Sequence, residues 1–131
     1  MRLDHIGIVV KSVEKAIEEY SSFRGEIEAP KIEVVESQGV KMAMFQENSM
    51  KIEFIEPIDN NSRVYNFLSK NSIGGLHHLC YKVEDIEETY MRYKKQLKCI
   101  VPKCSGHSGH IVAFFILRNT NCGYRLLELM E

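Results

Sequence analysis

The sequence has no long hydrophobic run, no excess of either charge and no C-x-x-C pair among its 131 residues. A membrane-spanning helix needs about 20 consecutive apolar residues, so a spanning segment is excluded. The 17 lysines and arginines balance 18 aspartates and glutamates, which leaves a net charge of −1. This balance argues against a protein that binds nucleic acid through its phosphate backbone.

A secretory signal is not expected either. The stretch MRLDHIGIVV places Asp4 and His5 where a signal peptide is apolar, and no small-residue cleavage site follows it. The cysteines do not suggest a disulfide framework; they are Cys80, Cys99, Cys104 and Cys122. A reduced, cytoplasmic protein is therefore favoured. The length and the 44% content of apolar residues are typical of one domain with a real core.

The most informative feature is an internal repeat. Residues 3–10 (LDHIGIVV) resemble residues 76–83 (LHHLCYKV) at an offset of 73. Residues 51–56 (KIEFIE) resemble residues 126–131 (LLELME) at an offset of 75. A small change in offset is what a loop insertion between two copies produces. The sequence therefore predicts two similar structural modules.

Each copy predicts the element order β-α-β-β-β. In the first copy, Ser12 can cap a helix that Gly25 ends. The apolar face of this helix has helical spacing and consists of Val13, Ala16, Ile17, Tyr20 and Phe23. In the second copy, Asp85 can cap the helix. The expected strands are residues 3–10, 31–36, 40–46, 50–55, 76–83, 98–101, 110–117 and 124–130.

These elements predict a single α+β domain over residues 1–131. Module one covers residues 1–57 and module two covers residues 76–131. The linker between them, residues 58–75, contains a short helix from Ser62 to Lys70. A module of about 60 residues buries little surface by itself, so we expect the two modules to pack together.

Both copies carry a histidine on the first strand and a glutamate on the last. His5 matches His78, and Glu53 matches Glu128. If the modules pack about a pseudo-twofold axis, these side chains converge. Two imidazoles and two carboxylates suit a divalent ion such as zinc, nickel, cobalt, iron or manganese. Each residue alone is more typical of a structural histidine or a solvated glutamate, but their recurrence in both copies favours a metal site with positions left for substrate.

A weaker metal candidate is the stretch CSGHSGH from Cys104 to His110. Its cysteine and histidines could serve as ligands. The glycine and serine content instead favours a mobile loop. The methionines of the first copy are expected to fill the core or line a pocket.

With these features, the sequence resembles the vicinal oxygen chelate superfamily, also called the glyoxalase, bleomycin-resistance and dioxygenase superfamily. Within it, the chain is most similar to the methylmalonyl-CoA epimerases. The resemblance covers nearly the whole chain. The stretches that carry it are DHIGIVV at 4–10, QGV at 38–40, IEFIEP at 52–57, FLSK at 67–70, GLHHL at 75–79, VEDI at 83–86, Gly123 and LEL at 127–129.

The resemblance implies paired βαβββ modules that form a cupped, barrel-like mixed sheet around one divalent metal. The implied metal ligands are His5, Glu53, His78 and Glu128. It also implies a homodimeric isomerase that acts on a small molecule, an acyl thioester such as an acyl-CoA. A base removes the α-proton, and the metal-stabilised enolate is reprotonated from the other face. Glu128 matches one proposed base of this reaction.

Two departures from the epimerase pattern leave the reaction open. The second acid or base of epimerases is a glutamate at the position of Met42, and methionine transfers no proton. Either another group takes its place, with Glu36 and Glu47 as candidates, or the reaction differs. Glu53 stands where some epimerases have glutamine and where glyoxalase I has glutamate.

Two alternative functions therefore remain. A glyoxalase I-like isomerase, or lactoylglutathione lyase, would use the same four ligands on the hemithioacetal of a 2-oxoaldehyde. A non-catalytic protein could instead bind a small molecule or a drug, as resistance proteins do, although retention of all four ligands counts against it. An extradiol dioxygenase is disfavoured, because those enzymes typically use two histidines and one carboxylate.

Overall fold

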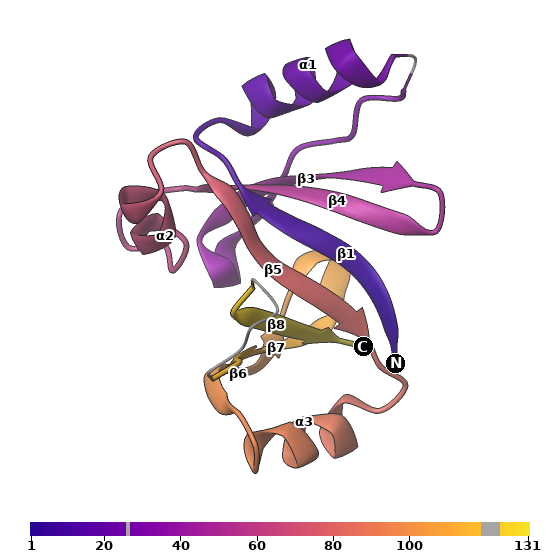
Figure 1. Ribbon diagram of the computed structural model, residues 1–131, viewed down its shortest axis with the longest axis vertical. Coiled ribbons are helices and arrows are strands. Elements are labelled where there is room, and N and C mark those ends of the chain that lie inside the picture. Colours follow the sequence, from indigo (N-terminus) through magenta and orange to yellow (C-terminus); the bar gives the residue numbers. More distant parts are fainter. Residues whose placement is uncertain (26, 119–123) are drawn as a thin grey trace.

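The computed structural model describes residues 1–25, 27–118 and 124–131. Its strands form one eight-stranded mixed sheet in the order β2-β3-β4-β1-β5-β8-β7-β6 (Figure 1). The first half contributes β1 (Arg2–Val9), β2 (Glu33–Val35), β3 (Val40–Glu47) and β4 (Met50–Pro57). The second half contributes β5 (Gly75–Lys82), β6 (Lys98–Ser105), β7 (Ile111–Ile116) and β8 (Leu126–Met130). The predicted α+β class with a mixed sheet is confirmed.

The two halves of the sheet have the same connectivity and meet at β1 and β5. β1 pairs in parallel with β4, and β5 pairs in parallel with β8. β1 and β5 themselves run antiparallel. The first strands of the two sequence copies, which carry His5 and His78, are therefore neighbours at the centre of the sheet.

Alternate residues of the strands face either a helix or the interior of the cup, as the pleat of a strand requires. In β3, Ala43 and Phe45 pack in the cluster that includes α1 (Val13–Arg24). Val40 and Met42 of the same strand belong to a different cluster, which lies on the inner side.

The second half repeats this arrangement. Ala113 and Phe115 of β7 pack in the cluster that includes α3 (Ile86–Lys94), whereas Val112 and Phe114 belong to an inner cluster. Figure 1 shows α1 beside β3 and β4 at one end of the molecule, and α3 beside β7 and β8 at the other. Both helices thus cover the outside, and the inner side of the curved sheet stays available for a site.

The helix boundaries follow the capping residues predicted from the sequence. Ser12 Oγ accepts a hydrogen bond from the backbone N–H of Lys15 at 3.3 Å. Asp85 Oδ1 accepts one from the backbone N–H of Glu88 at 2.9 Å. Gly25 ends α1 with a φ of +86°, which a residue with a side chain rarely adopts. None of the helices in the described part of the chain is long and apolar enough to cross a membrane.

Several sequence predictions are wrong in detail. Phe23 was expected on the buried face of α1 but is 76% exposed, because Tyr20 one turn earlier already makes the ring contacts with the sheet. The linker helix α2 (Tyr65–Lys70) begins three residues later than predicted, after a turn closed by the hydrogen bond from Tyr65 N–H to Ser62 O.

The predicted strand limits also change at both edges of the sheet. β2 ends at Val35, because Glu36–Gln38 forms a 3-10 turn. β6 continues to Ser105 through part of the predicted mobile loop. The structure gives Cys80, Cys99 and Cys104 as free thiols. Cys122 and Gly123 lie outside the described residues.

Candidate metal centre

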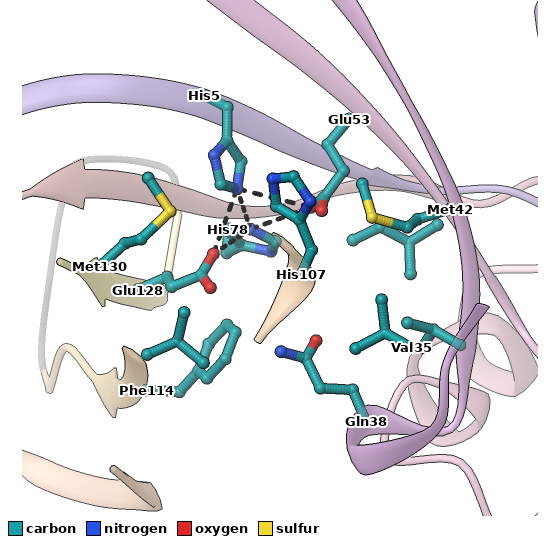
Figure 2. A pocket seen from close by; sticks show the side chains of 13 residues that line it. His5, Val35, Gln38, Met42, Glu53, His78, His107, Phe114, Glu128 and Met130 are labelled. Carbon is teal, nitrogen blue, oxygen red and sulfur yellow. Dashed lines mark hydrogen bonds and ion pairs between the residues drawn. The ribbon is translucent and has the colours of Figure 1, made fainter. Parts of the chain in front are cut away.

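Four ionisable side chains converge on the inner side of the sheet (Figure 2). His5 and His78 come from β1 and β5, and Glu53 and Glu128 come from β4 and β8. All four are buried, and the exposed fractions of the two histidines are only 2%. The structure thus brings together the four residues that the repeat singled out; their role as metal ligands remains a prediction.

The strand register explains how one half of this cluster forms. Gly7 on β1 is the Cα partner of Glu53 on β4 and also of His78 on β5. A Cβ atom at position 7 would lie 2.1 Å from His78 Cε1, far inside van der Waals contact. Glycine therefore leaves the space that the His78 ring occupies between the two modules.

The equivalent strand position in the second module, Cys80, brings the other two residues of the cluster together. Cys80 on β5 is the Cα partner of His5 on β1 and of Glu128 on β8. These three residues also offer ligand atoms within 4.8 Å of one another. Burial raises the pKa of the Cys80 thiol to about 12, which keeps the thiol protonated. The repeat aligns Cys80 with Gly7, so the polar residues that recur in both modules are the two histidines and the two glutamates.

The distances between donor atoms suit one shared ion. The Nε2 atoms of His5 and His78 are 3.2 Å apart. Glu128 Oε2 lies 3.2 Å from the first Nε2 and 2.9 Å from the second. Glu53 Oε2 lies 3.5 Å and 3.4 Å from the same atoms. The cavity between them holds about 20 Å³, enough for a single ion or water.

The charges of the cluster also favour a cation. Burial alone would raise the pKa of Glu128, but hydrogen bonds from His5 and His78 hold it below its ordinary value. Burial alone would lower the pKa of His5, but hydrogen bonds with Cys80, Glu128 and Glu53 raise it. A proton on His5 thus offsets part of the carboxylate charge. A divalent ion can replace that proton and balance the carboxylates.

Residues outside the cluster orient its first histidine. Asp4 Oδ2 lies 3.0 Å from His5 Nδ1, and Lys51 Nζ donates to the Asp4 carboxylate at 3.1 Å. A register shift in β1 between Leu3 and His5 accompanies the burial of two consecutive side chains. A carboxylate at Nδ1, such as that of Asp4, directs the opposite ring nitrogen, Nε2, toward a metal. Sequence reasoning did not assign Asp4 this role, although its place before His5 was a usable signal.

The second histidine has a different neighbour. His77 Nδ1 lies 3.0 Å from His78 Nδ1, and the His77 ring packs edge-on against Phe67 at 5.2 Å. Burial, and then the charge of His78, lower the pKa of His77 to about 3. His77 is therefore neutral. Its Nδ1 can share a hydrogen bond with His78 Nδ1, while His78 Nε2 faces the cluster.

The residues that line the cavity do not include either glutamate suggested in place of Met42 as the second acid or base. Met42 itself lines the cavity and is 2% exposed. Neither suggested substitute lines it: Glu47 pairs with Arg24 at 2.9 Å, and Glu36 borders a separate hollow. His107 does line the cavity. Sequence reasoning missed it, because the glycines and serines around it indicated a mobile loop.

A cupped mixed sheet of two βαβββ halves, with a buried cluster of two histidines and two glutamates at their junction, defines a known class. The profile of the glyoxalase/bleomycin resistance protein/dioxygenase superfamily matches residues 4–114, and the chain belongs to that superfamily.

The chain is similar to epimerases of CoA esters. It is 38% identical over 95 residues to the ethylmalonyl-CoA/methylmalonyl-CoA epimerase of Cereibacter sphaeroides, covering 72% of this chain and 69% of that protein. It is 30% identical over 130 residues to human mitochondrial methylmalonyl-CoA epimerase, covering 99% and 73%. A variant of Streptomyces coelicolor methylmalonyl-CoA epimerase in complex with 2-nitronate-propionyl-CoA superposes with a TM-score of 0.82 at 27% identity, covering 99% and 96%. The predicted superfamily and the predicted relationship to epimerase enzymes are confirmed.

Proposed function

We propose that the chain is a divalent-metal-dependent epimerase that acts on methylmalonyl-CoA or a similar acyl-CoA. The observation that carries this proposal is the convergence of two imidazoles and two carboxylates in an ion-sized cavity at the junction of the modules. Similarity to enzymes named as epimerases of methylmalonyl-CoA supports the substrate class.

His5, Glu53, His78 and Glu128 would hold the ion. A divalent ion there would supply positive charge beside the thioester oxygen, where negative charge develops as the α-proton leaves. Glu128 would accept that proton, because its carboxylate lines the cavity and its position matches a base of the related epimerases. Phe114 and Met130 line the same cavity and would limit the access of water to the reacting carbon.

A second cavity beside the predicted metal site could hold the part of the substrate that does not react. This cavity of about 310 Å³ shares Gln38, Val40 and Phe114 with the wall of the first. Its lining is mostly apolar but includes Arg63 and Asn66. An acyl thioester arm fits this lining, and the guanidinium can pair with an anionic group of the substrate.

Three further predictions accompany the proposal. The two modules act as one unit, because each supplies half of the predicted ligands. A homodimer is expected from the family resemblance, and light scattering after size-exclusion chromatography tests it. A cytoplasmic location follows from the interpretation of the sequence, and fractionation of cells tests it.

A glyoxalase I-like isomerase is the second candidate. The observation that favours it is Glu53, whose carboxylate lies within 3.5 Å of both Nε2 atoms of the cluster. A second carboxylate at this place matches the glyoxalase ligand set implied by the resemblance.

The test compares two substrates after loading the chelated protein with zinc, cobalt, nickel or manganese. Methylmalonyl-CoA is incubated in D₂O, and incorporation of α-deuterium is measured by mass spectrometry. The hemithioacetal of methylglyoxal is assayed in parallel. We expect metal-dependent exchange into methylmalonyl-CoA. Turnover of the hemithioacetal alone would identify a glyoxalase, whereas metal-independent ligand binding without either reaction would identify a binding protein.

A further inference from the structure

One proton-transferring side chain of the cavity has no part in the mechanism above. Among the described residues that line the ion-sized cavity, His107 is the only such side chain outside the four predicted ligands. Figure 2 shows it directed into the cavity, with Glu128 and Met42 toward opposite sides of the view. Its side chain is 21% exposed, so it is held largely inside the molecule.

The backbone around His107 forms a tight and closed turn. The N–H of Gly106 donates to His110 O at 2.7 Å, and the N–H of His110 donates to His107 O at 3.1 Å. Ser108 has a φ of +53° and Gly109 a φ of +77°, so two consecutive residues are left-handed. A non-glycine residue in this region costs free energy and persists where the surroundings hold it. The turn therefore fixes the direction of His107.

Contacts with the first half of the chain hold the turn over the cavity. Ser37 Oγ donates to the backbone oxygen of Ser105 at 2.8 Å, which joins the 3-10 turn after β2 to the end of β6. Glu33 Oε2 on β2 lies 3.5 Å from His107 Nδ1, and Ser108 Oγ lies 2.8 Å from the same nitrogen. Nδ1 thus has its partners, and Nε2 is the nitrogen available to a ligand.

Inversion of a stereocentre needs proton transfer on both faces of the carbon. Glu128 can serve one face, and Met42 cannot serve the other. We propose that His107, oriented by Glu33, is the second acid–base group, which protonates the α-carbon on the face opposite to Glu128. This assignment rests on the proposed epimerase function. An imidazole that a carboxylate orients at Nδ1 is a common general acid or base in enzymes.

The step balances without any co-reactant. The Cα–H bond breaks, its proton passes to the Glu128 carboxylate, and its electron pair forms the enolate. The protonated His107 then donates its Nε2 proton to the other face as the enolate pair forms the new C–H bond. The reverse direction exchanges the two roles. Water restores both groups afterwards, because Glu128 has gained one proton and His107 has lost one.

The experiment uses the metal-loaded full chain with each epimer of methylmalonyl-CoA in D₂O. Wild type, His107→Gln, His107→Asn and the control His110→Gln are compared. His110 lies in the same turn and its ring centroid is 5.8 Å from that of His107, but its Nδ1 contacts Glu131 O at 3.0 Å and it does not line the cavity. Inversion is followed with a stereospecific coupling enzyme, α-deuterium incorporation by mass spectrometry, and metal content by elemental analysis.

We expect both His107 variants to keep their metal and to lose inversion by about 100-fold or more, the usual contribution of one acid–base group. One epimer should still exchange its α-hydrogen with retained configuration, because Glu128 still serves that face. The other epimer should neither exchange nor invert. His110→Gln should match wild type in all readouts.

Two results would overturn the assignment and leave the epimerase function intact. One is inversion by both His107 variants within about threefold of wild type. The other is an equal loss of inversion and exchange for both epimers, which a structural role produces. If wild type neither exchanges nor inverts either epimer, the proposed function fails and the assignment of His107 fails with it.

Discussion

At the scale of single residues, the site depends on side chains that face one another across strands. His78 Nε2 lies within 3.4 Å of atoms of His5, Glu53 and Glu128, so its ring contacts every other member of the cluster. Its removal leaves two buried carboxylates and one imidazole. The cluster then lacks one of the two nitrogen donors that favour zinc, cobalt or nickel.

His78→Ala is expected to weaken metal binding by at least about 100-fold. Loss of a residue that only hydrogen-bonds to a metal ligand already lowers metal affinity by about 10–100-fold. The chain should still fold, since α1 and α3 pack on the outer side. Elemental analysis measures bound metal, and circular dichroism measures the fold. His110→Ala is the control. A His78→Ala protein with one equivalent of bound metal would remove the basis for the ligand set.

Gly7→Ala tests the same site through sterics alone. The added Cβ would meet His78 Cε1 at 2.1 Å, so the ring must move. We expect metal affinity to fall about tenfold or more, as for other displaced ligands. Gly25→Ala is the matched control, since its φ of +86° is strained but nothing lies within 4 Å of its Cβ. That variant should lose stability but keep its metal affinity.

At the scale of elements, an ion pair fixes the end of α1 on β3. Glu47 accepts hydrogen bonds from Arg24 Nε at 2.9 Å and Nη2 at 3.1 Å, and also one from the Tyr20 hydroxyl. The Arg24 guanidinium, followed by the Tyr20 hydroxyl, holds the pKa of Glu47 below its ordinary value of 4.5. A carboxyl group whose pKa is lower in the folded state stabilises the fold above its unfolded pKa.

Glu47→Gln should therefore lower the melting temperature by a few degrees at neutral pH. The difference from wild type should shrink as the pH falls below 4.5 and through the lower folded pKa. Differential scanning calorimetry over a pH series measures it. Glu18→Gln, at an exposed position of the same helix, is the control for the loss of one negative charge. A difference that is constant with pH would contradict the interpretation.

Most elements could be predicted from the sequence, and the failures have local causes. Caps at Ser12 and Asp85 are chemical signals within one turn of the helix, so α1 and α3 were placed correctly. Phe23 fits the helical period, but its ring packs on Tyr20 and stays 76% exposed, and no periodicity reveals where a supporting sheet ends. β6 was predicted too short, because its last residues, Cys104 and Ser105, begin the CSGHSGH stretch, which resembles a loop.

At the scale of the whole molecule, the predicted metal joins two halves of one sheet. Each half supplies one histidine and one glutamate, and within the sheet the pairing of β1 with β5 joins the two halves. An ion bound to all four side chains would bind the folded state and not the unfolded chain. Its binding free energy would then add to the stability of the fold.

Free metal at 100 times its Kd should raise the free energy of unfolding by about 2.7 kcal/mol relative to chelated protein. For a chain of this size, the melting temperature should rise by about 10 °C. Differential scanning calorimetry with a chelator and with added ion measures the shift. His78→Ala should show little of it. An equal shift in wild type and His78→Ala would indicate that the ion binds elsewhere.

The duplicated pattern was enough to predict the paired modules and the four clustered side chains, because a repeat preserves local order and marks equivalent positions. It could not predict which residues face the reacting carbon. His107 reaches the cavity through a left-handed turn held by Ser37 and Glu33 from the other half of the chain. Contacts between segments about 70 residues apart depend on how the sheet curves, and that curvature is a property of the folded molecule and not of any local stretch.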